Sequence, residues 1–211
     1  MDSNDAHARA WVEALAEGGF AIPLTRPSPD RHGRRHLLPA AIKLPKDTPR
    51  GRQLSERQSA IVRERYLPAL RPFPQAGHQV TRLREDGLRL IVASSSERAM
   101  LDMFLELVGI VTLIDGVIAA SDAAHSKPAP DLVAAALAKA ALPAAAAVML
   151  GDTPYDIAAA RQLGVGTIAP RCGGFADTDL PGALALYADP ADLLARYDTS
   201  PLRSVMAGET R

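Results

Sequence analysis

The sequence has 211 residues, enough to bury a sizeable core and to hold one domain, or one domain with an insertion. Its 24 Lys and Arg residues balance 24 Asp and Glu residues, and 47% of all residues are hydrophobic, a composition typical of a soluble protein and not of one that binds nucleic acid. No apolar run is long enough to cross a bilayer, the N-terminus does not resemble a signal peptide, and one cysteine excludes an internal disulfide, so a cytoplasmic protein is expected.

The N-terminal third of the chain alternates between helical pattern and a basic, proline-rich stretch. Apolar residues at helical spacing predict a helix over Asn4–Glu17, which Gly18 ends. The segment Pro23–Arg52 is rich in proline, lysine and arginine, and a mobile connection accounts for it better than binding of a polyanion or a phosphate group. Within it, only Leu37–Leu44 is expected to form a short helix. A further helix, capped at its first residue, is expected over Ser55–Leu67.

From residue 71 onward, helices and strands alternate. An extended stretch leads into a helix over Pro74–Arg84, and the strand Leu88–Ser94 follows. This strand lacks polar alternation from its third residue on, which indicates burial on both faces in a parallel sheet. The alternation predicts a doubly wound α/β core with right-handed crossovers, and Thr199–Arg211 is expected to be mostly disordered. The other expected elements are helices over 96–107, 130–141 and 154–163 and strands over 117–119, 147–150 and 165–169.

Two acidic residues follow the strand that ends at Leu150. Asp152 lies at the carboxyl end of that strand, and Asp156 lies one turn into the next helix. Two carboxylates at the mouth of a parallel sheet suit a hard cation such as Mg²⁺. A structural alternative stays open, because Thr153 and Asp156 also form a capping-box pattern, and the helix dipole favours an acid in the first turn.

Polar residues at two further positions predict a phosphate site. Ser94 ends a strand, and its hydroxyl, together with the amides of Ser95 and Ser96 at a helix N-terminus, could hold phosphate oxygens. A helix cap formed by Ser94 and Glu97 accounts for the same residues. Lys127, which precedes a proline, could neutralise phosphate charge, although an ordinary surface lysine fits the pattern too.

The order and spacing of these motifs resemble the haloacid dehalogenase-like (HAD) hydrolase superfamily, in particular its phosphoglycolate phosphatase and β-phosphoglucomutase-like branch. The resemblance covers residues 73–197. It implies that Ser94 and Lys127 are catalytic residues that bind the phosphoryl group, with Ser95 beside them. It also implies that Asp152 binds Mg²⁺ and that Asp156 supports the ion directly or through water. The matching stretches are Leu88–Ser96, Ser126–Pro128 and Leu150–Asp156.

The chain departs from that family at its N-terminus. The family's reaction uses an aspartate nucleophile, and a second aspartate two residues later as acid and base, in an Asp-x-Asp-Gly-Thr motif on a central strand. No such motif occurs in the 211 residues, and Asp2 falls at a helix start. The resemblance therefore implies a HAD core whose first central strand is missing. We hypothesise that translation starts further upstream and that the in-frame upstream nucleotides encode the motif.

The resemblance also divides the chain into parts. A helical cap is expected over 4–72, a Rossmann-like core over 73–197 with 1–3 as a remnant of its first strand and loop, and a disordered tail over 198–211. The expected function is Mg²⁺-dependent hydrolysis of a small phosphorylated metabolite through a phospho-aspartyl intermediate. A truncated, inactive remnant that binds phosphate or a partner is one alternative, and a phosphoglucomutase-like phosphosugar mutase is another. The substrate and the oligomeric state stay open.

Three smaller features do not add a site. His32 and His36 are four residues apart, but their basic, proline-rich surroundings argue against a zinc site. Cys172 follows a strand with no base indicated nearby, so a tolerated loop cysteine is expected and not a catalytic thiol. The family's glycine-rich substrate loop should fall near Arg26–Leu38, where the sequence differs from it, so the cap does not identify the substrate.

Overall fold

The chain forms two compact units in the computed structural model, which describes residues 1, 3–20, 44 and 48–206. The first unit is Met1–Arg71 and the second is Pro72–Arg211. Several expectations lie outside the described residues: most of the basic connection, nearly all of the short helix over 37–44, the His32 and His36 pair, and Asp2.

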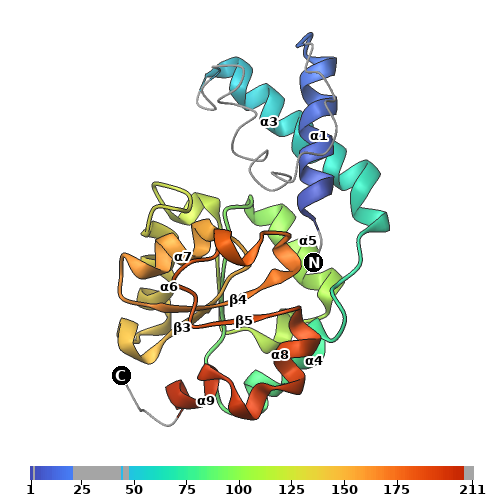
Figure 1. Cartoon of the computed structure of the whole chain (residues 1–211). Coiled ribbons are helices and arrows are strands. Elements are labelled where there is room, and N and C mark those ends of the chain that lie inside the picture. The colour runs from blue at the N-terminus through green and yellow to red at the C-terminus, as the bar shows by residue number, and fades with distance from the viewer. Residues whose placement is uncertain (2, 21–43, 45–47, 207–211) are drawn as a thin grey trace. The chain divides into compact units, whose positions relative to one another are not determined.

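Two helices form the first unit's apolar contact. Helix α1 (Asn4–Glu17) has the bounds that the sequence predicts, and it packs against α3 (Pro49–Ile61), which lies beside it in Figure 1. Trp11 and Leu15 of α1 and Leu54 of α3 form one buried cluster. Full burial of an aliphatic side chain of this size contributes about 1.5–3 kcal/mol, so the cluster is a substantial stabilising contact.

Helix α3 begins earlier than the sequence predicts. The side chain of Thr48 accepts a hydrogen bond from the backbone N–H of Gly51, and Pro49 occupies the first turn, so the expected start at Ser55 is wrong. The chain then continues as a π-helical turn over Val62–Tyr66. The Thr-Pro start was hidden because its neighbours are as basic as the segment before it.

Helices and parallel strands alternate along the second unit, which confirms the α/β class expected from the sequence (Figure 1). No helix in the described ranges is long and apolar enough to cross a bilayer. The helices are α4 (Ala76–Glu85), α5 (Arg98–Val108), α6 (Asp131–Ala140), α7 (Pro154–Arg161), α8 (Pro190–Ala195) and α9 (Pro201–Met206). The strands are β1 (Ile91–Ala93), β2 (Gly116–Ile118), β3 (Val148–Leu150), β4 (Gly166–Pro170) and β5 (Ala185–Tyr187).

The strands of the second unit form two separate parallel sheets. In one sheet β1 pairs with β2, with Val92 opposite Val117. In the other the order is β3–β4–β5, with Met149 of β3 opposite Thr167 of β4. Among the residues that the structure describes, β1 and β3 are therefore each an outermost strand of their own sheet.

Helices cover both faces of the larger sheet. Met149 of β3 packs with Val133 of α6 and with α7 in one apolar cluster. Val148, the preceding residue, packs with Leu83 of α4 and Leu193 of α8 in another cluster. Because neighbouring residues of a strand point to opposite faces, α6 and α7 cover one face and α4 and α8 cover the other (Figure 1).

Strand β1 is shorter and more exposed than the sequence predicts. A strand over 88–94 that is buried on both faces is expected, but the ladder covers only Ile91–Ala93, and all three residues are half-buried. Within the described residues, one edge of β1 has no neighbouring strand. It therefore lacks the partner that would cover its residues and lengthen the ladder.

The C-terminal part is more ordered than the sequence predicts. Pro201–Met206 forms α9, and Leu202 is buried in the cluster that joins α4 to α8, so the expectation of a disordered tail over 198–211 is wrong for this helix. The preceding β5 and α8 were also missed. The sequence did contain a cap signal for α8, since Asp189 directly precedes Pro190. In the structure the side chain of Asp189 accepts a hydrogen bond from the backbone N–H of Asp192.

A hydrogen bond between Tyr197 and Asp86, the C-cap residue of α4, links the C-terminal part to that helix. A hydrogen bond from the Tyr197 hydroxyl holds the pKa of Asp86 below its ordinary value, and burial raises the pKa of Tyr197 to about 12. An aspartate whose pKa is lower in the folded state stabilises the fold above its unfolded-state pKa, and this contribution is lost as the pH falls through the folded-state pKa. We expect Tyr197→Phe to lower the melting temperature at neutral pH, and the deficit to shrink at acidic pH; thermal melts across that range measure both.

Tyr187→Phe is the matched control, because Tyr187 is also buried and also has an arginine over its ring, Arg196 in place of Arg82, whereas the hydrogen bond that lowers the pKa of Asp86 comes from Tyr197. Its effect on the melting temperature should not depend on acidic pH. A Tyr197→Phe deficit that stays constant down to strongly acidic pH would contradict the role given to Asp86.

Candidate functional site

Polar side chains gather at the carboxyl ends of β1 and β3. Ser94 directly follows β1. Gly151 and Asp152 follow β3, and Thr153 is the N-cap of α7. Ligands of α/β sheets bind beyond the carboxyl ends of the strands, so the edge that these residues occupy is the candidate site.

A capping box fixes the start of α7. Asp156 Oδ2 accepts hydrogen bonds from the backbone N–H of Thr153 at 3.1 Å and from Thr153 Oγ1 at 2.7 Å, and the backbone N–H of Asp156 donates to Thr153 Oγ1 at 3.2 Å. The structural alternative considered for this pair is therefore confirmed. The box uses one carboxylate oxygen of Asp156 and holds the other in a defined direction.

Lys127 forms an ion pair with the second carboxylate oxygen of Asp156. Its Nζ donates to Asp156 Oδ1 at 2.6 Å and to the backbone oxygen of Ala93, the last residue of β1, at 3.3 Å. The two side chains are only 15% and 5% exposed, so Lys127 is not the ordinary surface lysine that its sequence surroundings allow. One buried ammonium group thus joins the end of β1 to the first turn after β3.

The serines after β1 leave one hydroxyl free for a ligand. Ser94 Oγ accepts a hydrogen bond from the backbone N–H of Ser96 at 3.1 Å. The expected cap between Ser94 and Glu97 is wrong, because Glu97 is itself the N-cap of α5 and Ser94 bonds within its own turn. The Ser95 hydroxyl is buried and has no hydrogen-bond partner among the described residues. A buried unpaired hydroxyl is destabilising unless something else bonds it.

Asp152 carries a carboxylate without an ion pair in the described part of the chain. Burial raises the pKa of Asp152 above its ordinary value, and the charge of Asp156 adds to this shift. The charge of Lys127 opposes both effects from a distance, because its direct ion pair is with Asp156. A desolvated carboxylate beside a second carboxylate is a group whose charge a bound cation would offset.

Gly151 allows the close approach of strand and helix at this point. A Cβ atom on Gly151 would lie 2.4 Å from Asp156 Cβ and 2.8 Å from Asp156 Cγ. Any larger residue at 151 must therefore displace the carboxylate that holds Lys127. This glycine is required by packing and not by a left-handed backbone conformation.

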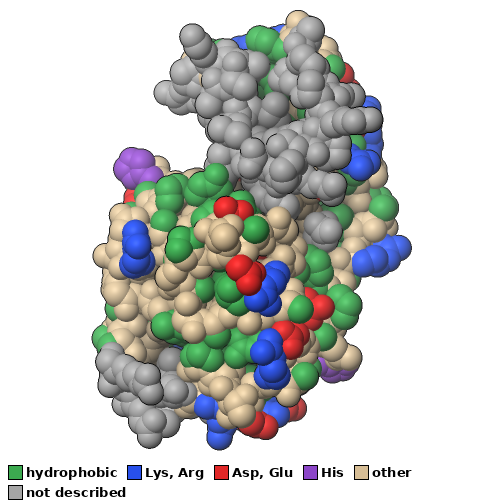
Figure 2. Space-filling view, viewed as in Figure 1, with side chains coloured by type: hydrophobic (Ala, Val, Ile, Leu, Met, Phe, Trp, Pro, Cys, Tyr) green, Lys and Arg blue, Asp and Glu red, His purple; other side chains and the backbone are tan. Residues whose placement is uncertain are grey.

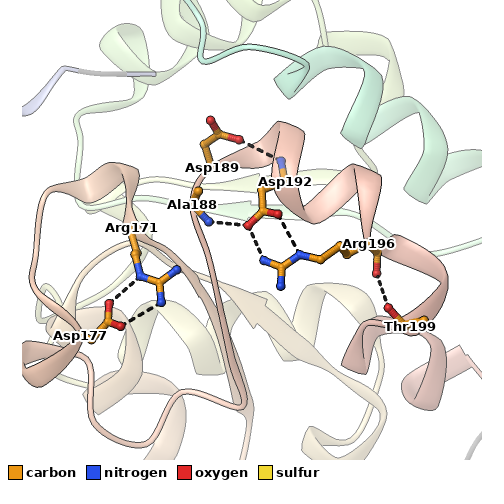
Figure 3. Close-up of polar contacts among 7 residues, drawn as sticks. All are labelled: Arg171, Asp177, Ala188, Asp189, Asp192, Arg196 and Thr199. Atoms are coloured by element: carbon orange, nitrogen blue, oxygen red, sulfur yellow. Dashed lines mark hydrogen bonds and ion pairs between the residues drawn. The ribbon is translucent and has the colours of Figure 1, made fainter.

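A loop after β4 closes over Asp152. A Cβ atom on Gly173 would lie 2.1 Å from the backbone oxygen of Asp152, so only glycine fits there without displacement. The loop is held by Arg171, whose Nε and Nη2 donate to Asp177 Oδ1 and Oδ2 at 2.6 and 2.9 Å (Figure 3). The role of Gly173 was missed. A glycine pair shortly after a strand, at 173 and 174, was the available signal.

Cys172, in the same loop, is not a catalytic thiol. Burial raises the pKa of Cys172 to about 11, and the charge of Asp152 adds to this shift. The thiol therefore stays protonated at neutral pH, and a protonated thiol is a poor nucleophile. This agrees with the expectation of a tolerated loop cysteine.

The residues fit a magnesium ion only in part. Where the structure describes the chain, no three His, Cys, Asp or Glu side chains lie close enough together to hold a metal. The hard oxygen donors of Asp152 suit Mg²⁺. Both oxygens of Asp156 are already engaged, by Thr153 and by Lys127, so Asp156 fits better as a supporting charge than as an open ligand.

Several charged side chains elsewhere in the second unit form ion pairs at the surface. Basic and acidic side chains lie beside one another on the face shown in Figure 2. Arg84 and Asp115, for example, form an ion pair with side chains 46% and 27% exposed. Ion pairs of this kind contribute little to stability, which sets the buried pair of Lys127 and Asp156 apart.

Comparisons with known proteins agree on one family. A family model described as haloacid dehalogenase-like hydrolase matches residues 44–170, more than half of the chain. The protein named Probable phosphatase IndB from Dickeya dadantii is 27% identical over 183 residues, which are 82% of this chain and 77% of that protein. Fructose-1-phosphate phosphatase YqaB from Escherichia coli is 25% identical over 176 residues, 81% of this chain and 90% of that protein. The crystal structure of a hydrolase from Pseudomonas syringae is similar with a TM-score of 0.80 and 25% identity, and the match covers 94% of this chain and 93% of that one.

Breaking the buried ion pair should destabilise the second unit. We expect Lys127→Met to lower the free energy of unfolding by about 3 kcal/mol, because it leaves the Asp156 carboxylate buried without a countercharge. Arg98→Met is the matched control, since it breaks an exposed ion pair with Asp102 and should cost about 0.5 kcal/mol. Urea unfolding curves measure both, and equal losses in the two variants would contradict the importance of burial.

A pair of glycine substitutions tests the approach of β3 to α7. We expect Gly151→Ala to lower the free energy of unfolding, because the new methyl group overlaps Asp156. Gly77 lies in α4, and a methyl group there would make only an ordinary contact, 3.5 Å from the backbone oxygen of Val108, so Gly77→Ala should raise the free energy of unfolding by about 0.5–1 kcal/mol. Urea unfolding again gives both values. A Gly151→Ala protein as stable as wild type would show that Asp156 is not confined as described.

Proposed function

Because the chain belongs to the haloacid dehalogenase-like hydrolases, we propose that it acts as a Mg²⁺-dependent phosphatase on a small phosphorylated metabolite. The observation that carries this proposal is the buried ammonium group of Lys127, held by Asp156 at the carboxyl ends of the strands. Both curated relatives described above are named as phosphatases, which supports the class of reaction. One cysteine in 211 residues supports a reducing compartment, so the cytoplasm is the proposed location.

The phosphoryl group is proposed to bind between Lys127 and the serines after β1. Lys127 would supply a positive charge that is already desolvated and oriented, so little reorganisation would accompany binding. The hydroxyl of Ser94 and the unpaired hydroxyl of Ser95 would bond phosphate oxygens. Ser94 and Lys127 are therefore the proposed catalytic residues of the 211-residue chain.

Asp152 is the proposed magnesium ligand. When bound, Mg²⁺ would supply positive charge to a phosphate oxygen. Asp152 would orient the ion, and Asp156 would act on it through its charge and through its hold on Lys127. The loop around Gly173 would exclude water from one side of Asp152, since it lies against the backbone of that residue.

The nucleophile is proposed to come from residues encoded upstream. A phospho-aspartyl reaction needs one carboxylate to attack phosphorus and a second to protonate the leaving oxygen and then activate water. The 211 residues contain no Asp-x-Asp-Gly-Thr motif to supply them. The same absence favours one alternative function, a remnant that binds phosphate without turnover.

Turnover of a generic aryl phosphate with Mg²⁺ tests the proposal, on the 211-residue chain and on a chain extended by the in-frame upstream residues. We expect hydrolysis by the extended chain alone. In that chain Asp152→Asn and Lys127→Met should each lower kcat/KM on the order of 100-fold, because each removes charge stabilisation of the transition state. Asp102→Asn removes an exposed carboxylate of α5 that is paired with Arg98, so this variant is the control and should retain full activity.

Melting of the 211-residue chain separates the two functions. Mg²⁺ together with phosphate should raise its melting temperature, and Asp152→Asn should abolish the shift. A shift without turnover in either chain would support the binding remnant. If both chains fold but show neither the melting shift nor turnover, the proposed site is contradicted altogether.

A further inference from the structure

The loop that carries Lys127 is not held in place by apolar packing. It follows β2 and leads into α6, and none of the residues 121–130 is fully buried. The backbone N–H of Ala129 donates to the backbone oxygen of Ser126 at 3.1 Å, so Lys127 and Pro128 form the centre of a tight turn. This hydrogen bond fixes the shape of the turn. It does not fix the turn relative to the strands whose ends form the candidate site.

The first residue of α6 fixes one side of this turn. Asp131 Oδ1 accepts a hydrogen bond from the backbone N–H of His125 at 3.2 Å, and it lies 3.0 Å from His125 Nδ1. The hydrogen bond from the His125 side chain lowers the pKa of Asp131, and the helix dipole also favours a charged acid in a first turn. This contact holds the backbone just before Lys127. The backbone just after Lys127 needs a second contact.

Gln162, the C-cap residue of α7, provides the second contact. Its Nε2 donates to the backbone oxygen of Pro128 at 2.7 Å and to the backbone oxygen of Ala158 at 3.0 Å. A carboxamide nitrogen has two N–H donors, so both are used and the direction of the side chain is defined. Ala158 is among the last four residues of α7, whose carbonyl groups have no partner within a helix. Gln162 thus joins the end of α7 to the residue that follows Lys127.

Helix α7 therefore contacts Lys127 and its loop at two places. Asp156, in the first turn of the helix, accepts from Lys127 Nζ at 2.6 Å, and Gln162, at the end of the helix, holds the neighbouring backbone. About 9 Å of helix separates these two contacts, at about 1.5 Å per residue. A lysine side chain is a flexible four-carbon stem, so an ion pair defines the place of its ammonium group only when the backbone is fixed too.

We propose that Gln162 is a positioning residue, which sets the place of the Lys127 ammonium group by fixing the backbone of the residue after it. This inference rests on the proposed function, in which Lys127 binds the phosphoryl group. Charge stabilisation of a transition state depends on groups that are already in place, and small displacements of such groups are costly. Gln162 is itself exposed, and it acts on the reaction through the loop.

Acetylation of lysines by acetic anhydride, resolved by residue with mass spectrometry, tests this hold on the full 211-residue chain. Gln162→Met keeps the length of the side chain and removes both donors. We expect it to speed the acetylation of Lys127 about fivefold, because the turn opens locally more often. Lys139, which is exposed on α6, is the internal reference and should react at the wild-type rate. An unchanged rate at Lys127 would overturn the proposal.

Two further variants separate position from stability. Arg161→Met places the same new side chain at the neighbouring exposed position and leaves the bond to Pro128 in place, so Lys127 should react as in wild type. Gln162→Lys supplies a new N–H donor and should restore most of the slow reaction. Urea unfolding should give the two methionine variants similar stability, because a hydrogen bond at the surface adds little to it. Equal acceleration at Lys139 and Lys127 would indicate general loosening and would overturn the proposal.

Kinetics of the chain extended upstream test the consequence for the reaction. Gln162→Met should lower kcat for the aryl phosphate about tenfold, because the ammonium group is displaced. The Mg²⁺ concentration for half-maximal activity should stay unchanged, since Gln162 acts on Lys127 and not on Asp152. Faster acetylation with an unchanged kcat would overturn the positioning role. If the extended wild-type chain shows no turnover, the proposed phosphatase fails, and the acetylation of Lys127, which needs no substrate, alone supports or overturns the role of Gln162.

Discussion

The buried ion pair between Lys127 and Asp156 is the interaction on which the site depends. It is formed where two sheets that share no hydrogen-bonded ladder end at the same edge. Gly151 gives Asp156 the space to approach the strand, and Thr153 fixes the direction of its carboxylate. A buried pair is stabilising only when its remaining hydrogen bonds are satisfied, and here the capping box and the carbonyl of Ala93 satisfy them.

The turn after β3 was predicted correctly from a local signal in the sequence. The turn from Gly151 to Asp156 specifies a capping box through residue types at fixed spacing, and the structure forms that box. Lys127 had no such signal, because its burial follows from the meeting of β1 and α7, which are distant in sequence. The start of α3 at Pro49 was missed because its cap lies in basic surroundings that resemble a connection.

The two-sheet arrangement explains why β1 differs from the strand that the sequence predicts. The apolar run that contains β1 resembles a fully buried central strand, and that is the environment for which its residues are suited. In the described chain β1 has a strand on one edge only, so just Ile91–Ala93 join a ladder. Sequence periodicity reports the environment that a strand suits. It does not report which neighbour supplies that environment.

The loop that lies over Asp152 also contains a residue whose reactivity can report on the site. Cys172 is the only cysteine of the chain, and its thiol senses the charge on Asp152 in addition to its own burial. A cation bound at Asp152 would remove the part of that effect that comes from charge and make the thiolate easier to form. The alkylation rate of a single native cysteine thus becomes a reporter of metal occupancy, with no label added to the protein.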